Sequence, residues 1–391
     1  MRPARPAPLR RLAALPAAVP ARPVAPLAPR RLAAPPAALP ARPVEPLAQG
    51  SCRLKLTVAY DGTSFAGFQF QAGKVRTVQG ELERAAARVL LPASRVVGAS
   101  RTDGGAHAAG QVAHLDVAGS ADGLGSLASL LMCFNGVLPD DVKLRALELA
   151  PPGFDAHFSS VGKAYVYRLS GEATPDPLSA RARWWVHDRW CERARGKPQA
   201  PADLLLDVAA MAEAAAHLTG VKDFSTFADN KRPAGLGALK RKKPKLAALA
   251  AAGVKPVRTP EKNTRLLWRA DVVPGGAPGC VDVHLEGSGF LYRMVRVIAA
   301  GLVEVGHGRL RPAQFKQLLD AGDRARLEVE AAPPHGLVLE RVLYELPPGV
   351  DASLLAALPR SSTDEELQAE PAAAAAPAGG GAAPDEASGA A

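Results

Sequence analysis

Apolar residues recur with two different periods along this chain, and the order in which those periods alternate limits the fold more than any other feature. Residues 53–60 alternate apolar and polar side chains and end at Asp61-Gly62, which predicts a strand followed by a turn. Alternation or short apolar runs predict further strands at 96–99, 111–118, 143–149, 163–169, 266–273, 280–286 and 337–344.

Segments of helical period lie between these strands. Thr77 is placed to cap a helix whose apolar face contains Leu82 and Ala86. Further helices are predicted at 127–134, 204–218, 290–305 and 312–319. No GxGxxG motif follows a strand, which disfavours a doubly wound parallel sheet. The pattern therefore predicts an α+β protein of two similar domains, each an antiparallel-rich sheet covered by helices.

The two ends of the chain are too biased in composition to build such domains. Residues 10–29 and 30–49 repeat one another with four differing positions, and both copies are rich in Pro and Arg. Proline removes a backbone donor and breaks helices, so we expect residues 1–50 to be disordered. The Ala/Gly/Pro-rich segment 348–391 is expected to be a disordered tail. The domains are then 51–153, with the loop of the candidate catalytic Asp103, and 154–347, with a basic insertion at 229–262.

The N-terminal segment carries Arg, with Glu45 as its only acid. This composition is typical of an organelle transit peptide, although the absence of Ser before Ser51 counts against it. A duplication inside a disordered tail is the alternative. We expect an organellar protein, in the chloroplast rather than the mitochondrion, with the cytoplasm or nucleus as alternatives.

The formal net charge of +10 favours an anionic partner, with nucleic acid as the first candidate. Residues 229–262 contain ten Lys and Arg and only two acids. This insertion could bind RNA phosphates, serve as a targeting address, or be a solvated charge run without a partner. The four cysteines have no paired spacing, which argues against zinc and disulfides. The sequence contains no run of about 18 apolar residues, so it predicts no membrane-spanning helix.

Residues 100–107, Ser-Arg-Thr-Asp-Gly-Gly-Ala-His, form a polar loop between two predicted strands. Asp-Gly alone is usually only a turn, but paired glycines let backbone approach a ligand and Arg101 offers a planar donor group. The apolar helix at 290–305 contains Arg293 and Arg296, and a buried Arg needs a carboxylate partner. We therefore expect Asp103 to pair with one of them and stay ionised, unless both arginines reach the surface. Tyr165 and Tyr167 share a strand face, as half-buried aromatics or as groups that stack on a base.

Eight segments in order along 58–344 resemble the tRNA pseudouridine synthase A (TruA) family. They are VAYDGTSFAGFQFQ (58–71), VQGELERA (78–85), SRTDGGAHAAGQVAH (100–114), FNGVLPDDV (134–142), FDAHFSSVGKAYVYRL (154–169), DFSTF (223–227), FLYRMVRVIAAGLVEVG (290–306) and APPHGLVLERVLY (332–344). The resemblance implies the pseudouridine synthase fold with a central active-site cleft, acting as a homodimer on the anticodon stem-loop of tRNA at positions 38 to 40.

The resemblance also implies residue roles. Asp103 is expected to attack the uridine, at the sugar or at the ring; Tyr165 to pack on the flipped base, whose C5 proton it could take; and Arg296 to hold the aspartate. Arg101 is expected to hold the flipped nucleotide. The remaining substrate-binding candidates are Thr102, Gly105, His107 and Phe290. No metal and no cofactor are expected, because the reaction is an isomerisation, and no membrane partner is implied.

This chain departs from the family pattern at five positions. They are Phe68 for the usual Trp, Ser100 for Gly, Gly104 for Ala, His157 for Arg and Val297 for Asn. None removes the aspartate, tyrosine or arginine, but His157 weakens a fixed positive charge. Two alternatives stay open: an RNA-binding protein or chaperone without catalysis, and a pseudouridine synthase that acts on another RNA.

Overall fold

The computed structural model describes residues 50–71, 73, 75–90, 95–172, 174–187, 206–229, 260–356 and 358. All of them belong to one compact unit, Leu39–Ala391. The predictions made for residues 1–49, for most of the basic insertion (230–259) and for the tail beyond residue 358 fall outside the described residues. No described helix has the length and apolar character needed to cross a membrane.

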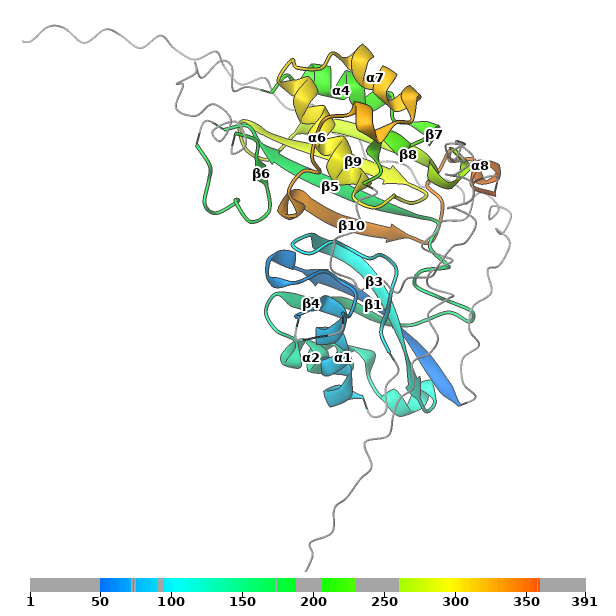
Figure 1. Ribbon diagram of the computed structural model, residues 1–391. Helices are drawn as coiled ribbons and strands as arrows, with labels where there is room; N and C mark the ends of the chain where they lie inside the picture. The colour runs from blue at the N-terminus through cyan, green and yellow to red at the C-terminus, as the bar shows by residue number, and fades with distance from the viewer. Residues whose placement is uncertain are drawn as a thin grey trace, which may run out of the picture. The chain divides into compact units, whose positions relative to one another are not determined.

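Ten strands form one sheet in the order β4-β1-β3-β10-β5-β9-β8-β7, with β2 paired to β3 and β6 to β5 (Figure 1). Paired strands in the described sheet are antiparallel except at β3–β10 and β5–β6, which confirms the antiparallel-rich prediction. The strands are β1 Ser51–Tyr60, β2 Val97–Gly98, β3 His107–Ala118, β4 Val142–Leu149, β5 Gly162–Ser170, β6 Trp184–Trp185, β7 Gly220–Asp223, β8 Thr264–Pro274, β9 Cys280–Gly287 and β10 Leu337–Leu343.

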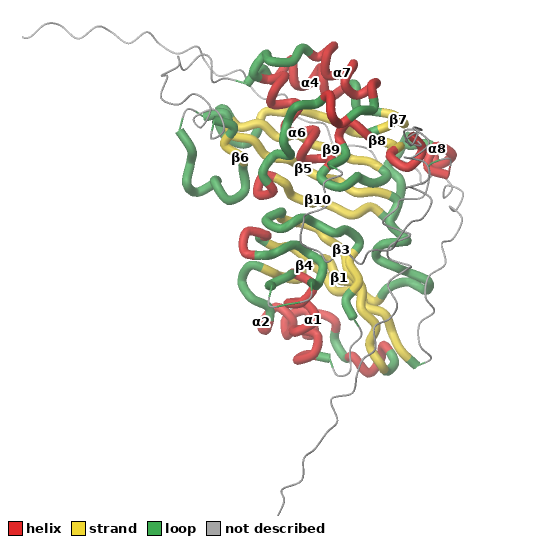
Figure 2. Tube along the Cα trace, in the orientation of Figure 1, coloured by secondary structure: helices red, strands yellow, loops and turns green. Residues whose placement is uncertain are grey.

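The helices form two groups along this sheet. Figure 2 shows α1 and α2 beside β1 and β4, whereas α4, α6 and α7 lie beside β5, β9 and β8. The α-helices are α1 Val78–Val89, α2 Leu127–Val137, α4 Val208–Ala216, α6 Met294–Gly306, α7 Pro312–Ala321 and α8 Ala352–Ala356. Short 3₁₀ turns are η1 Gly62–Ser64, η2 Ala121–Leu124, η4 Ser225–Phe227, η5 Pro260–Asn263, η6 Arg324–Arg326 and η7 Pro334–Gly336.

One face of the sheet carries the main core. Every second residue of β1 from Leu54 to Tyr60 is buried, as the alternation predicted, and these side chains join one cluster with Tyr165 and Tyr167 of β5. Because side chains alternate along a strand, Arg168 projects from the opposite face. The two tyrosines therefore lie on the helix-bearing face of the sheet.

The predicted elements are confirmed with shifted boundaries. Thr77 caps α1, its hydroxyl accepting from the Gly80 amide. β3 begins at His107 rather than at residue 111. The helix predicted from Phe290 begins only at Met294, because Arg293 takes a left-handed backbone (φ 55°) that a helix cannot continue through. The short strands β6 and β7 were not predicted, since neither is long enough to show a period.

Candidate active site

The loop that carries Asp103 lies between β2 and β3 and is fixed by its neighbours. The Phe68 amide donates to the Thr102 carbonyl (3.2 Å), and the Tyr60 hydroxyl lies 2.7 Å from the Thr102 hydroxyl. Tyr60 and Thr102 are both buried. The segment just before Asp103 is thus held on both backbone and side chain, which orients the carboxylate that follows.

Gly105 lets this loop turn sharply. Its φ of 81° lies in the left-handed region, and an added Cβ would be 2.9 Å from Cγ of Pro334. Its amide donates to the Phe65 carbonyl at 3.2 Å. A side chain at this position would be strained in backbone and would also meet η7. Gly105 therefore shapes the loop, and glycine is required at this position by its backbone angle and by the close packing of Pro334.

Arg296 and Asp103 form the ion pair that the sequence suggested. Nη1 of Arg296 lies 2.6 Å from Oδ2 of Asp103, and the two side chains are 9% and 21% exposed. Nε of Arg296 donates to the Ala332 carbonyl (2.6 Å), while the Ala332 amide donates to the Arg296 carbonyl. The guanidinium of this α6 residue is therefore oriented by the segment just before η7. A charge-assisted bond of this length holds the carboxylate in one orientation.

Arg293, the other arginine of this segment, has a different partner. Its Nη1 donates to Asp229 at 3.1 Å, and its guanidinium lies over the Tyr292 ring. Arg293 precedes α6, whereas Arg296 lies in its first turn. Of the two arginines, Arg296 is therefore the partner of Asp103.

Tyr165 lies close to Asp103 on the core face of β5. Its hydroxyl is 2.8 Å from the Ser100 hydroxyl, and its ring packs edge-on against Phe290, with centroids 5.0 Å apart. Burial raises the pKa of Tyr165 to about 12; the Ser100 hydrogen bond lowers it in part, and the charge of Asp103 raises it further. The phenol is therefore protonated at neutral pH and senses the field of the Asp103 carboxylate.

Gln111 supports the site although the sequence did not single it out. Its side chain is completely buried, and Nε2 donates to the Ser100 carbonyl at 2.7 Å. Oε1 accepts from the Val112 amide at 3.2 Å. Gln111 thus anchors the residue that contacts Tyr165. The available signal was a glutamine at the alternating positions of β3 that otherwise hold Ala113, Leu115 and Val117.

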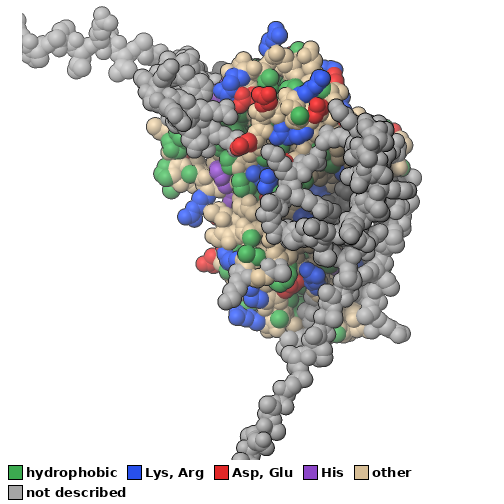
Figure 3. Space-filling model, viewed as in Figure 1, with side chains coloured by type: hydrophobic (Ala, Val, Ile, Leu, Met, Phe, Trp, Pro, Cys, Tyr) green, Lys and Arg blue, Asp and Glu red, His purple; other side chains and the backbone are tan. Residues whose placement is uncertain are grey.

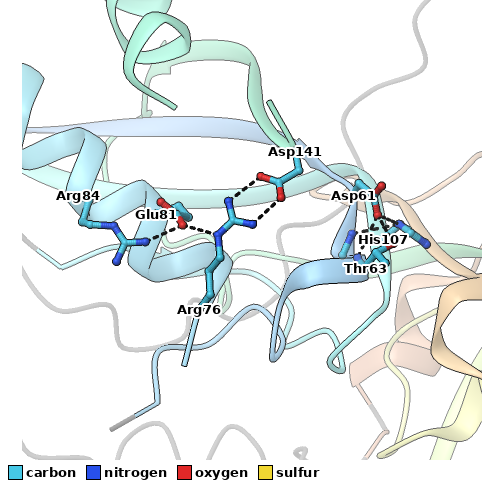
Figure 4. A network of polar contacts seen from close by, with 8 residues as sticks. Asp61, Thr63, Arg76, Glu81, Arg84, His107 and Asp141 are labelled. Atoms are coloured by element: carbon cyan, nitrogen blue, oxygen red, sulfur yellow. Dashed lines mark hydrogen bonds and ion pairs between the residues drawn. The ribbon is translucent and has the colours of Figure 1, made fainter. Parts of the chain in front are cut away.

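His107 lies apart from the Asp103–Tyr165 contacts, in the polar network of Figure 4. Its Nδ1 accepts from the Gly62 amide (3.1 Å), and its Nε2 lies 2.8 Å from the Arg181 carbonyl, which places the ring proton on Nε2. Nδ1 is also 3.1 Å from Asp61. The imidazole therefore ties three backbone segments together at the start of β3.

Two further residues border the site. Arg101 is exposed, so its guanidinium is accessible to a ligand. His157, which stands where the family usually has Arg, places Nδ1 3.0 Å from the Ala99 carbonyl, next to Ser100. This departure thus supports the base of the loop. Within the described ranges, no group of His, Cys, Asp and Glu is suited to hold a metal ion, and Cys52, Cys133 and Cys280 are free thiols.

Three groups thus converge at one place on the sheet of this α+β protein: a fixed carboxylate, a guanidinium paired with it, and a neutral phenol. This set of groups is suited to nucleophilic attack on an electrophilic carbon without a metal. The residues come from both halves of the chain: Asp103 and Ser100 from before β3, and Tyr165, Phe290 and Arg296 from β5 onward.

Comparison with known proteins defines the class. Residues 214–345 match the family described as tRNA pseudouridine synthase. The chain is 38% identical to tRNA pseudouridine synthase A of Frankia casuarinae over 80% of this chain and 96% of the relative. It is 35% identical to the protein of that name from Bacillus subtilis and 38% identical to that from Nitratidesulfovibrio vulgaris, over 75% of this chain and 99% of each relative. The fold is thus that of a pseudouridine synthase.

Within that class, the chain belongs to the tRNA pseudouridine synthase A family.

Proposed function

We propose that this chain isomerises uridine to pseudouridine in tRNA, with Asp103 as the reacting carboxylate. The observation that carries the proposal is the partly buried Arg296–Asp103 ion pair beside the Tyr165 phenol. Membership of a family whose relatives are named tRNA pseudouridine synthase A supports tRNA as the substrate. An alternative, RNA binding without catalysis, offers no reason for a partly buried ion pair next to a buried phenol.

The reaction breaks the bond from N1 to C1′ of uridine and forms one from C5 to C1′. C5 loses a proton and N1 gains one, so reactant and product have the same composition and no electrons are transferred. Asp103 provides the nucleophile, either to the sugar or to the ring, and Arg296 keeps its attacking oxygen oriented. The target base must leave the stack to reach this site.

Tyr165 and Phe290 provide the surface on which the extruded base lies. Their rings meet edge-on, and Tyr165 is held by Ser100. Because burial favours the protonated phenol, Tyr165 acts as a neutral packing and hydrogen-bonding group while the base detaches and turns. Arg101, exposed beside Asp103, is placed to bind the phosphate or ribose of the flipped nucleotide.

The deciding experiment incubates the purified protein with an unmodified tRNA transcript and maps pseudouridine. We expect product from the native chain and none from Asp103→Asn, which keeps the shape of the side chain and should still bind tRNA. Binding without product by the native chain would favour the non-catalytic alternative. Native-like turnover by Asp103→Asn would remove the assigned role.

The finer assignments are also proposals. We propose that the target uridines lie in the anticodon stem-loop at tRNA positions 38 to 40, on the basis of the family resemblance. Mapping the modified positions in several tRNAs, with a messenger RNA fragment as competitor, tests this choice. Modification elsewhere in tRNA, or preferred modification of the competitor, would contradict it.

We further propose that the protein is a homodimer that is imported into an organelle, the chloroplast in the first instance. The acid-poor, Arg-rich composition of residues 1–50 supports import, and the family resemblance supports the dimer. Sedimentation of the purified protein tests the dimer. Uptake and processing by isolated chloroplasts and mitochondria test the location. A chain that neither organelle imports would favour the cytoplasm or nucleus instead.

A further inference from the structure

A second basic site lies next to the start of β3, away from Tyr165. A cavity of about 450 Å³ is lined in part by Arg145 of β4, Arg168 of β5 and Arg181 of the turn before β6. We call this cavity the arginine groove. Arg168 projects from the face of β5 opposite to Tyr165. Arg168 therefore lies on the other side of the sheet from the Tyr165 phenol.

The three guanidinium groups have no ion-pair partner among the described side chains. Arg145 and Arg181 are exposed and Arg168 is half-buried. The acid across the strand from Arg168 is Asp282, but its carboxylate is paired with Arg183 at 2.7 Å. The positive charge of the groove is therefore not neutralised across the strand.

The acids that line the groove contact groups other than its three arginines, although Lys143, the partner of Asp140, lines the groove as well. Asp141 is paired with Arg76 through two bonds of 2.6 and 2.8 Å (Figure 4), and Asp140 lies 3.5 Å from Lys143. Asp61 accepts from both the amide and the hydroxyl of Thr63. Partial burial tends to raise the pKa of Asp61, but these hydrogen bonds, aided by His107 and Arg181, lower it overall. None of the three carboxylates is bonded to a guanidinium of the groove.

This distribution differs from that on the helix-bearing surface. In the view of Figure 3, basic and acidic side chains lie close together over the region of α4 and α7. The groove is also lined by both signs, four basic and three acidic residues, but its three arginines have no ion-pair partner among the described side chains. Guanidinium groups match phosphate geometry, so the groove is suited to a ligand with several phosphates.

The groove is also connected to the reactive loop. His107, which lines it, is the first residue of β3 and directly follows the loop of Asp103. Its ring holds the Arg181 backbone on one side and the Gly62 amide on the other. The groove and the reactive carboxylate are thus fixed relative to each other by one short segment of chain.

We propose that the arginine groove binds phosphodiester groups of the substrate RNA beyond the target nucleotide. The proposal rests on the function proposed above. Only part of a bound RNA can enter the site of Asp103, and the groove offers a second contact on the other side of the same strand segment. It would add affinity without touching the reacting atoms.

The test neutralises the groove with the triple variant Arg145→Gln/Arg168→Gln/Arg181→Gln. The control Arg88→Gln/Lys222→Gln/Arg326→Gln removes the same charge from outside the groove. We expect the groove variant to bind tRNA about tenfold more weakly at physiological salt, and the slope of log K against log salt to fall by about 2. Turnover at saturating tRNA should be unchanged.

A further variant, with the three arginines replaced by Lys, keeps the charge and should keep most of the salt slope. A groove variant whose affinity and salt slope equal those of the control would overturn the proposal. So would a groove that binds inorganic phosphate, measured by calorimetry, while tRNA affinity is unaffected by the triple variant. A native chain that binds tRNA without forming pseudouridine would instead refute the proposed function, and the groove comparison would still be decisive.

Discussion

Nη1 of Arg296 lies 2.6 Å from Oδ2 of Asp103, although 193 positions separate the two residues in the chain. The contact joins the first turn of α6 to the loop before β3. It is the point at which the two halves of the chain together define one reactive group.

Arg296→Ala should abolish measurable pseudouridine formation and lower the free energy of unfolding by about 3 kcal/mol, because it leaves a partly buried carboxylate without its partner. Denaturant unfolding and product mapping measure the two effects. The double variant Asp103→Asn/Arg296→Met should recover stability but no activity. Activity in Arg296→Ala comparable to that of the native chain would contradict the assigned role.

Ser100→Ala removes the hydroxyl that lies 2.8 Å from the Tyr165 phenol. We expect kcat to fall by about tenfold, with little change in KM, because a freer phenol positions the base less well after it leaves the stack. Single-turnover kinetics with saturating tRNA measure this. Ser100→Thr, which keeps the hydroxyl, serves as the control. A change confined to KM would show that the hydroxyl acts in binding alone.

Tyr165→Phe should change the response of stability to alkaline pH. The pKa of Tyr165 is raised from 10.0 to about 12 by burial, so the unfolded chain loses this proton first as pH rises. The native chain should therefore lose about 2 kcal/mol between pH 10 and pH 12 that the variant does not lose. Urea unfolding at both pH values measures the difference. Equal losses in the two proteins would show that the phenol is accessible to water.

Gln111→Leu leaves the Ser100 carbonyl without its side-chain donor inside a buried site. We expect a loss of about 1–3 kcal/mol in stability, since an unsatisfied buried acceptor keeps its full desolvation cost. Activity should fall because Ser100 loses its anchor. Thermal unfolding and product formation are the measurements. Gln111→Glu retains an acceptor but supplies no such donor, and it should be at least as harmful.

Much of the fold followed from the sequence because most elements are long enough to show a period. The alternation of side-chain type predicted β1, β5 and β9, and the N-cap residue Thr77 predicted the start of α1. The start of α6 was misplaced, since the apolar run from Phe290 gives no sign that Arg293 adopts a left-handed backbone. Local pattern cannot report a single dihedral angle that packing imposes.

The site was predictable in part. The cost of burying Arg296 indicated a carboxylate partner, and the ion pair with Asp103 agrees with that argument. Gln111 and the arginine groove were not predicted, because each depends on neighbours brought together by strand pairing. The charges in the sequence do not show which arginines have no carboxylate as an ion-pair partner among the described side chains. Only the register of β5 against β9, which sets Arg168 opposite Asp282, makes that visible.

The last strand of the sheet occupies its middle. β10 inserts between β3 and β5, touching β3 in parallel through only two residue pairs. During synthesis on the ribosome, the edges of β3 and β5 that β10 will cover therefore stay unpaired until residues 337–343 emerge. A nascent chain that stalls before that point exposes two strands ready to pair with other molecules. The completed sheet thus depends on β10 to cover the edges of both β3 and β5.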